Sequence, residues 1–219
     1  MAGGAACAAL EKRRGALMTT VILATNNAHK ADEIANALSF EGWRFETLAS
    51  AGIHSDPEED AGTFEGNARI KARAAWEAAR AAGRRCAVLA DDSGLQVDAL
   101  GGAPGVYSSR YAGADADDAA NNAKLLAELA DVSDAQRTAR FACTLVLIDE
   151  DGAETVARGT VEGRIGRQPR GEEGFGYDPL FWPDAFEGRC TLAEVPQSQK
   201  AAVSHRGNAL RALAAQLQQ

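Results

Sequence analysis

Two five-residue, mainly apolar runs, 20–24 and 86–90, each end abruptly at polar residues, and they limit the folds open to this chain. Their valine, isoleucine and leucine content over so short a length is typical of strands buried on both faces. The first run leads through a polar loop into a segment with helical spacing of apolar residues, 28–41. The order strand, loop, helix predicts that a buried strand delivers a polar loop to its carboxyl end.

The rest of the chain continues this alternation and then changes to a hairpin. We predict a strand at 43–48, a loop at 50–62, and then a helix that begins after the N-cap Thr63, runs to about Ala82 and is ended by Gly83. A helix at 115–130 follows. Strands at 138–149 and 153–164 are joined by a turn at Asp151 and Gly152, and the last predicted element is a helix at 204–217. Strands alternating with helices, followed by a long hairpin, predict an α/β protein with a long mixed β-sheet and flanking helices.

Charge and length limit the partners and the domain organisation. A net charge of −8 disfavours a nucleic acid polymer or an anionic membrane as partner, but a small phosphorylated ligand fits if the few lysines converge. We expect one domain over 18–219, because 219 residues fit one globular domain or two closely joined lobes. Residues 1–17 are alanine-rich and then basic, the reverse of a signal peptide, and we interpret them as a disordered extension or as an overlong start before Met18.

The cysteines and the apolar segments indicate a cytoplasmic protein. The four cysteines lie far apart without a CxxC pair, so neither a zinc site nor a disulfide framework is predicted. No apolar stretch approaches the roughly 20 residues that cross a bilayer.

The loop after the first strand has the composition of a phosphate-binding segment. It consists of Thr25, Asn26, Asn27, Ala28, His29 and Lys30. Free N–H groups at a helix N-terminus accept phosphate oxygens, and a lysine adds a charge beside them. The pattern GxxxxGK is missing, so this is not a Walker loop. A turn that only caps the helix is the alternative interpretation.

Two pairs of carboxylates are the candidates for metal and water chemistry. Asp91 and Asp92 follow the run 86–90 directly, and Glu58 and Glu59 lie in an acidic loop just before the predicted helix that begins after Thr63. Carboxylates so placed can hold a hard cation and accept a proton from water. On the same helix Asn67 and Lys71 are four residues apart and share a face. Solvated acidic turns are the alternative.

Two later segments suit a nucleobase. The segment 174–179 supplies Phe175, Gly176, Tyr177 and Asp178, and a second group supplies Lys200, His205 and Arg206. Aromatic faces and a few polar groups are typical of a base pocket, and donors from the second group would find an O6 acceptor. Core packing of the aromatic residues is the alternative. The glycine-rich turns 101–105 are interpreted as shaping the backbone that leads to Tyr107, Ser109 and Arg110.

In this order the segments resemble the inosine triphosphate pyrophosphatase family. The similar stretches are 25–30, 63–72, 89–111, 174–181 and 204–209, so the resemblance covers most of the chain from about Val21 to Leu210. It implies two lobes around a central cleft, a homodimer, and Mg²⁺-dependent hydrolysis of dITP, ITP and XTP to the monophosphate and pyrophosphate.

The resemblance also implies roles for individual residues. Asp92 would accept the proton of the attacking water, Ser93 would contact substrate, and Mg²⁺ would be held by Asp92 and by Glu58 or Glu59. From the chemistry of the carboxylates alone, Asp91 is a further candidate ligand. Residues 25–30, with Asn67 and Lys71 nearby, would hold the phosphates, and the segments around 175–178, Lys200 and 205–206 would hold the base and the rest of the nucleotide. A Maf-like nucleotide pyrophosphatase with another base preference and a nucleotide-binding module without turnover are the alternative functions.

Overall fold

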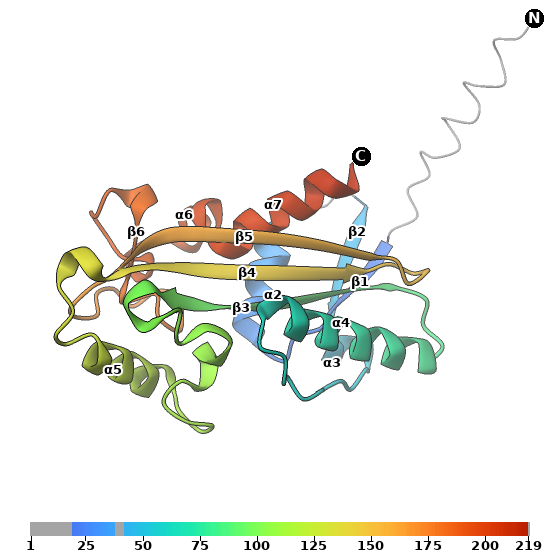
Figure 1. The fold of residues 1–219 in the computed structure, drawn as a ribbon. Helices are drawn as coiled ribbons and strands as arrows, with labels where there is room; N and C mark the ends of the chain where they lie inside the picture. The colour runs from blue at the N-terminus through green and yellow to red at the C-terminus, as the bar shows by residue number, and fades with distance from the viewer. Residues whose placement is uncertain (1–18, 38–41, 219) are drawn as a thin grey trace, which may run out of the picture.

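The structure, a computed structural model, describes residues 19–37 and 42–218. In these residues six strands form one mixed sheet, in the order β2-β1-β3-β4-β5-β6 (Figure 1). They are β1 (Thr19–Leu23), β2 (Trp43–Thr47), β3 (Ala87–Val97), β4 (Thr138–Ile148), β5 (Glu154–Ile165) and β6 (Phe181–Pro183). β1 is parallel to β2 and β3, and the other neighbouring pairs are antiparallel. The predicted long mixed sheet is therefore confirmed.

Helices flank this sheet, and two of them lie where the sequence did not indicate a helix. The α-helices are α2 (Ala28–Ala37), α3 (Leu48–Ala51), α4 (Phe64–Ala81), α5 (Asp118–Glu128), α6 (Gln197–Val203) and α7 (His205–Leu217). The 3-10 helices are η1 (Asp98–Leu100), η2 (Gly105–Arg110), η3 (Asp134–Gln136), η4 (Asp184–Phe186) and η5 (Leu192–Glu194). The unpredicted helices are α3 and α6, which are only 4 and 7 residues long and too short to show a periodic pattern.

The helix boundaries follow the signals in the sequence. Thr63 caps α4 by accepting a hydrogen bond from the backbone N–H of Gly66, and Ser204 caps α7 by accepting one from Gly207. Gly83 follows α4 with a φ of +73°, a conformation that favours glycine. The predicted helix 28–41 begins as expected, but its positions 38–41 lie outside the described residues, as does the predicted extension 1–17.

One prediction about the third strand is corrected. The two aspartates after 86–90 do not leave the end of a strand, because β3 continues through them to Val97. β4 pairs with β3 over Val88–Val97 and satisfies its backbone, whereas β1 pairs with it only over Ala87–Leu89. The polar residues therefore lie in the middle of a long strand, beside the point where its neighbour β1 ends.

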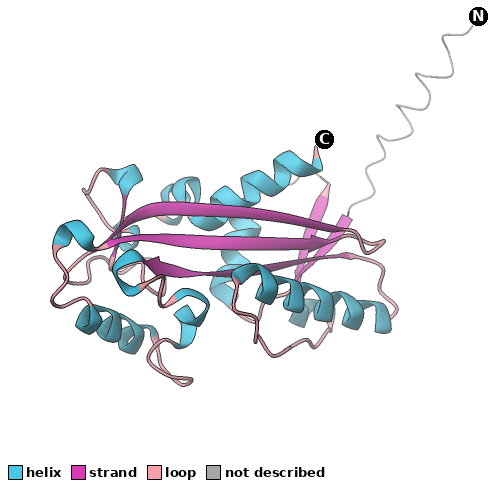
Figure 2. Cartoon of the chain, viewed as in Figure 1, coloured by secondary structure: helices cyan, strands magenta, loops and turns pink. Residues whose placement is uncertain are grey.

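Three long strands join two lobes. Figure 2 shows β3, β4 and β5 running along the molecule, with the shorter strands confined to its two ends. At the β1 end, α2 and α7 pack on one face of the sheet, and α3 and α4 on the other. At the other end, a third apolar cluster gathers the far halves of the long strands, α5 and the segment before β6. In the described part of the chain, no helix is long and apolar enough to cross a bilayer.

Candidate active site

A cleft of about 560 Å³ lies between the two lobes, at the middle of β3. The predicted site residues that line it are Thr25, Asn26, Asn27, Lys30, Glu59, Lys71, Asp92, Ser93, Phe175, Gly176, Tyr177, Asp178, Lys200, His205 and Arg206. Segments separated by up to about 180 residues of sequence thus meet at one place, because each lies at the end of an element or in the middle of β3. Five predicted residues do not line it: Ala28, His29, Glu58, Asn67 and Asp91.

Asp91 and Asp92 point to opposite faces of the sheet. Successive side chains of a strand alternate between faces, so Asp91 shares a face with Leu89 and faces α2 and α7, whereas Asp92 shares the face of α4. Asp91 is completely buried and contacts Lys30 at 2.8 Å and Arg206 at 3.1 Å. Its burial would raise the pKa of this carboxyl, but the two cations outweigh that effect and hold the pKa well below its usual range.

Asp92 forms a compact group with a lysine and a second carboxylate. The Lys71 ammonium lies 3.0 Å from Asp92 Oδ1 and 2.9 Å from Glu59 Oε2. Burial raises the pKa of Asp92, and the nearby Lys71 only partly offsets this. Burial alone would lower the pKa of Lys71, but the carboxylates of Asp92, Asp91 and Glu59 raise it, so the ammonium stays charged.

The second oxygen of Asp92 is available for a ligand. Asp92 Oδ2 is buried and has no hydrogen-bond partner within residues 19–37 and 42–218. A buried carboxylate oxygen in this state costs free energy unless a bound group satisfies it. The atom therefore marks the place where a cation or a water fits.

The acidic loop separates its two glutamates. Glu59 is half-buried and lines the cleft, whereas Glu58 is exposed and does not. Asn67 is buried on α4, and its side-chain oxygen accepts a hydrogen bond of 2.9 Å from the backbone N–H of Ala61. In this structure Asn67 therefore holds the acidic loop against α4, behind the cleft surface.

The loop after β1 combines both interpretations of its sequence. Asn27 Oδ1 accepts a hydrogen bond from the backbone N–H of Lys30, and Thr25 Oγ1 accepts one from Asn27, so the segment does cap α2. Four residues around the start of α2 also line the cleft, namely Thr25, Asn26, Asn27 and Lys30. Asn26 donates a hydrogen bond of 3.3 Å to Asp56 and so ties this loop to the acidic loop.

A chain of buried charges lies under the other end of the cleft. Lys200 Nζ lies 2.6 Å from both Glu33 Oε1 and Asp178 Oδ2, and Glu33 also pairs with Arg206. Burial would lower the pKa of Lys200, but Asp178 and Glu33 raise it, so the side chain is a charged donor. Arg206 joins this chain to the middle of β3, because it contacts both Asp91 and Ser93.

Aromatic rings cover the same end. The ring of Phe175 is stacked 5.3 Å from His29 and lies 4.8 Å from the Lys200 ammonium. His205 stacks on Phe141 at 4.9 Å, and burial together with nearby Arg206 lowers its pKa well below the usual range, so the imidazole is neutral. Tyr177 is buried in the third apolar cluster and donates a hydrogen bond to the backbone oxygen of Ser108. For Tyr177, therefore, the alternative interpretation of core packing applies as well.

Some residues of the site were not predicted. Ser55, Asp56, Arg110, Asp118 and Phe141 line the cleft, although no role was assigned to them from the sequence. Glu33 pairs with two predicted residues from below. Its spacing of three from Lys30 on one helix was the available signal, since such residues share a face. Which carboxylate a buried lysine finds is a tertiary property, so the pairing itself could not be predicted.

The carboxylates that face the cleft fit a hard divalent cation such as Mg²⁺. Glu59 and Asp92 both lie at hydrogen-bond distance from one ammonium, and Asp92 Oδ2 has no partner among the described residues. Over those residues, no three histidine, cysteine, aspartate or glutamate side chains come together as a complete ligand set. Mg²⁺ is commonly held by one or two carboxylates, with waters and substrate phosphates completing its shell. A site of two carboxylates suits this mode of binding.

The chain matches one protein family and is similar to proteins of known structure. The model of the Ham1 family matches residues 21–216. Proteins named dITP/XTP pyrophosphatase from Exiguobacterium sibiricum and Lactiplantibacillus plantarum are each 50% identical to this chain. The alignments cover 90% and 89% of this chain and 96% and 92% of those proteins. A solved HAM1 protein from Coxiella burnetii has a TM-score of 0.80 at 40% identity, covering 92% of this chain and 99% of that one.

Proposed function

Because the chain belongs to the Ham1 family, we propose that it hydrolyses the deaminated purine nucleoside triphosphates dITP, ITP, dXTP and XTP to the monophosphate and pyrophosphate. The family resemblance stated from the motifs is borne out by these matches. The observation that carries the chemistry is the group of Asp92, Lys71 and Glu59, which lines the same cleft as most of the loop 25–30.

The phosphates bind at the N-terminus of α2. The free N–H groups of its first turn and the Lys30 ammonium favour phosphoryl oxygens. Lys30 already contacts Asp91 at 2.8 Å, so it is held in place before substrate arrives. Lys71 faces the same space and stabilises the negative charge that develops on the departing pyrophosphate.

Asp92 accepts a proton in the reaction. A water attacks the α-phosphorus, the bond from this phosphorus to the bridging oxygen breaks, and pyrophosphate leaves with the bond's electron pair. The proton of the attacking water passes to the Asp92 carboxylate. Mg²⁺ held by Glu59 and Asp92 would supply positive charge at the phosphate oxygens and lower the pKa of a bound water. Glu58 and Asp91 do not face the cleft, and we therefore assign the metal to the other two carboxylates.

The base binds among Phe175, Lys200 and His205. Hypoxanthine and xanthine present an acceptor O6 where adenine presents an amine, so the charged Lys200 donor discriminates against adenine. The neutral His205 has a buried Nδ1 without a hydrogen-bond partner in the described part of the chain, and a base edge is a group that could satisfy it. A base stacked on Phe175 would lie near Lys200, whose ammonium is 4.8 Å from the centre of the Phe175 ring.

The proposal includes the organisation of the protein. We propose that residues 18–219 act as one catalytic domain, with the cleft between its two lobes. A homodimer and a cytoplasmic location, where free nucleotides are found, are proposed on the sequence resemblance.

The first test is pyrophosphate release from dITP, XTP, dGTP, dATP and dTTP in the presence of Mg²⁺. We expect fast release from dITP and XTP only, and a loss on the order of 10²–10⁴ in kcat for Asp92→Asn, since this removes the proton acceptor. A normal rate for Asp92→Asn would contradict the mechanism. Preferred release from dTTP would indicate the Maf-like alternative, and nucleotide binding without any release would indicate a binding module.

A further inference from the structure

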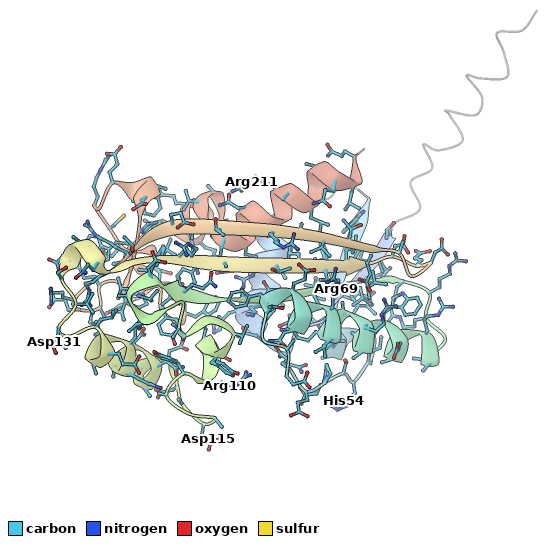
Figure 3. The ribbon with its side chains drawn as sticks, in the orientation of Figure 1. His54, Arg69, Arg110, Asp115, Asp131 and Arg211 are labelled. Atoms are coloured by element: carbon cyan, nitrogen blue, oxygen red, sulfur yellow. The ribbon has the colours of Figure 1, made fainter. Side chains whose placement is uncertain are left out.

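We propose that Arg110 binds the terminal phosphoryl group of the triphosphate substrate and closes the cleft across the two lobes. This inference rests on the proposed function and adds to it a residue on η2. Figure 3 labels Arg110 on η2, which belongs to the α5 side of the molecule. Its guanidinium reaches the other side of the cleft, because Nη2 donates a hydrogen bond of 3.5 Å to the backbone oxygen of Glu59 in the acidic loop.

Arg110 differs from the other cations of the cleft, because it has no ion-pair partner within residues 19–37 and 42–218. Five cations line the cleft: Lys30, Lys71, Arg110, Lys200 and Arg206. Four of them lie within 4.0 Å of a carboxylate. For Arg110 the described residues supply no such carboxylate, only the Glu59 carbonyl and the face of the Tyr107 ring.

The charge balance of the cleft makes an unpaired cation useful. Among the described residues, five carboxylates also line the cleft, namely Asp56, Glu59, Asp92, Asp118 and Asp178, and they balance the five cations found there. A nucleoside triphosphate carries about four negative charges, which spread over the phosphoryl oxygens in the transition state. Paired cations have much of their charge balanced already, whereas Arg110 can offer its full charge to the ligand.

The position of Arg110 points to the phosphates distant from the base. Base-binding groups lie around Phe175 and Lys200, and Asp92 lies at the proposed reacting phosphorus. From Asp92 the contacts continue through Lys71 to Glu59, whose backbone oxygen meets Arg110. A triphosphate that extends from the base past Asp92 would therefore bring its terminal phosphoryl group to the guanidinium.

The backbone around Arg110 is held firmly. At Gly94 an added Cβ would lie 2.4 Å from Ser108 Oγ and 2.5 Å from the Gly105 oxygen, so η2 packs directly on β3. Ser108 also accepts a hydrogen bond of 2.9 Å from the backbone N–H of Leu95. Groups that stabilise a transition state work best when fixed in advance on such a support.

The side chain is also oriented by an aromatic neighbour. The guanidinium carbon lies 5.2 Å from the centre of the Tyr107 ring, and this tyrosine is 58% exposed. Stacking on the ring restricts the planar group at little cost to its hydrogen bonding. The planar guanidinium can donate two parallel hydrogen bonds to two oxygens of one phosphoryl group, whereas a lysine ammonium cannot.

The test compares triphosphate and diphosphate substrates in three variants: Arg110→Gln, Arg110→Lys and, as a control for lost positive charge, Arg69→Gln. Arg69 lies on α4 and pairs with Glu65 and Glu154 away from the cleft lining (Figure 3). Rates are measured as pyrophosphate release from dITP and phosphate release from dIDP, with inhibition by imidodiphosphate as a binding probe. Thermal unfolding of each variant reports whether it is folded.

We expect Arg110→Gln to lower kcat/KM for dITP on the order of 10²-fold, as for loss of one oxyanion donor. The rate with dIDP, which lacks the terminal phosphoryl group, should change by less than about threefold, because it has lost the contact in both proteins. Imidodiphosphate should inhibit the variant about tenfold less well. The kcat/KM of Arg110→Lys for dITP should lie between those of the unmodified protein and Arg110→Gln. Lysine keeps the positive charge but lacks the two parallel donors of a guanidinium.

The inference would be overturned if Arg110→Gln lowered kcat/KM equally for dITP and dIDP, or if it lowered kcat/KM for neither substrate. The first result would mean that Arg110 only supports the fold or the acidic loop, and the second that it does not touch substrate. Failure of the proposed function is distinguished by the unmodified protein, which would then release no pyrophosphate from dITP.

Discussion

Adjacent residues in this chain have different roles because the backbone turns them to different sides. Asp91 and Asp92 follow each other on β3, and only Asp92 faces the cleft. The same separation occurs in the acidic loop, where Glu59 is directed into the cleft and Glu58 toward solvent. Composition shows that carboxylates are present, but the direction of each side chain decides which of them reaches substrate.

The two glutamates provide a matched pair of variants. We expect Glu59→Gln to raise the Mg²⁺ concentration for half-maximal activity about 10- to 100-fold, since a carboxylate ligand becomes a neutral amide. Glu58→Gln should stay within about twofold of the unmodified protein, because this side chain is exposed and outside the cleft lining. The measurement is activity against Mg²⁺ concentration at fixed dITP. The reverse ranking would place the metal at Glu58.

At the scale of elements, the site depends on how closely α7 lies on the sheet. An added Cβ at Gly159 on β5 would lie 2.2 Å from the backbone nitrogen of Ala209 and 2.3 Å from the oxygen of His205. α7 can therefore pack on β5 only because this position lacks a side chain. Since α7 begins with His205 and Arg206, this contact also sets where their side chains enter the site.

We expect Gly159→Ala to destabilise the protein by about 3 kcal/mol, because overpacking against backbone cannot be relieved by a side-chain rotation. Its activity should fall as well, through displacement of His205 and Arg206. Gly62→Ala is the control, since nothing lies within 4 Å of an added Cβ there, and it should change stability by no more than about 0.5 kcal/mol. Urea unfolding of both variants measures the difference. Equal midpoints would show that α7 shifts freely on the sheet.

At the scale of the whole molecule, buried charges join the elements that form the floor of the cleft. Asp91 on β3, Glu33 on α2, and Lys200 and Arg206 on α6 and α7 contact one another. Such groups are costly to bury singly, and removing one partner leaves an uncompensated charge. The elements are therefore coupled, and the stability of the cleft depends on pH.

Stability is lost at both acid and alkaline pH, because the pKa of Asp91 is lowered in the folded protein and the pKa values of two lysines are raised. The pKa of Asp91 is held well below its ordinary 3.8, so its contribution to stability is present above about pH 3.8 and is lost as pH falls through the folded value. The pKa values of Lys71 and Lys200 are raised above 10.5, so their contribution is complete below about pH 10.5 and is lost at more alkaline pH. Between these limits both contributions stay constant.

The variant Asp91→Asn measures how much the ionised Asp91 carboxylate contributes to the free energy of unfolding. It should lower the free energy of unfolding by about 3–5 kcal/mol near pH 7, because Arg206 and Lys30 lose a buried counter-ion. Below about pH 3.8 the difference from the unmodified protein should narrow, because Asp91 of the unfolded chain takes up a proton there while the folded carboxylate stays ionised to lower pH. Urea midpoints from pH 2.5 to 9 measure both curves. A constant difference across this range would show that ionisation of Asp91 does not contribute to stability.

The fold was largely predictable because its signals are local. The buried runs that became β1 and the first half of β3, the cap Thr63, the hairpin at Asp151 and Gly152, and the N-cap of α7 all depend on residues close in sequence. The errors have a tertiary origin. β3 extends through its aspartates because β4 pairs with it along that length, and periodicity cannot report a strand partner from fifty residues away.

The sequence by itself determined the family, the sheet, most of the helices that carry the motifs, and most of the polar residues that line the cleft. These follow from residue types and short spacings. Only the tertiary structure decided which carboxylates face the cleft, that Glu33 lies beneath it, and that Arg110 reaches the acidic loop. Strand register and helix packing set these directions, because they bring together side chains far apart in the chain.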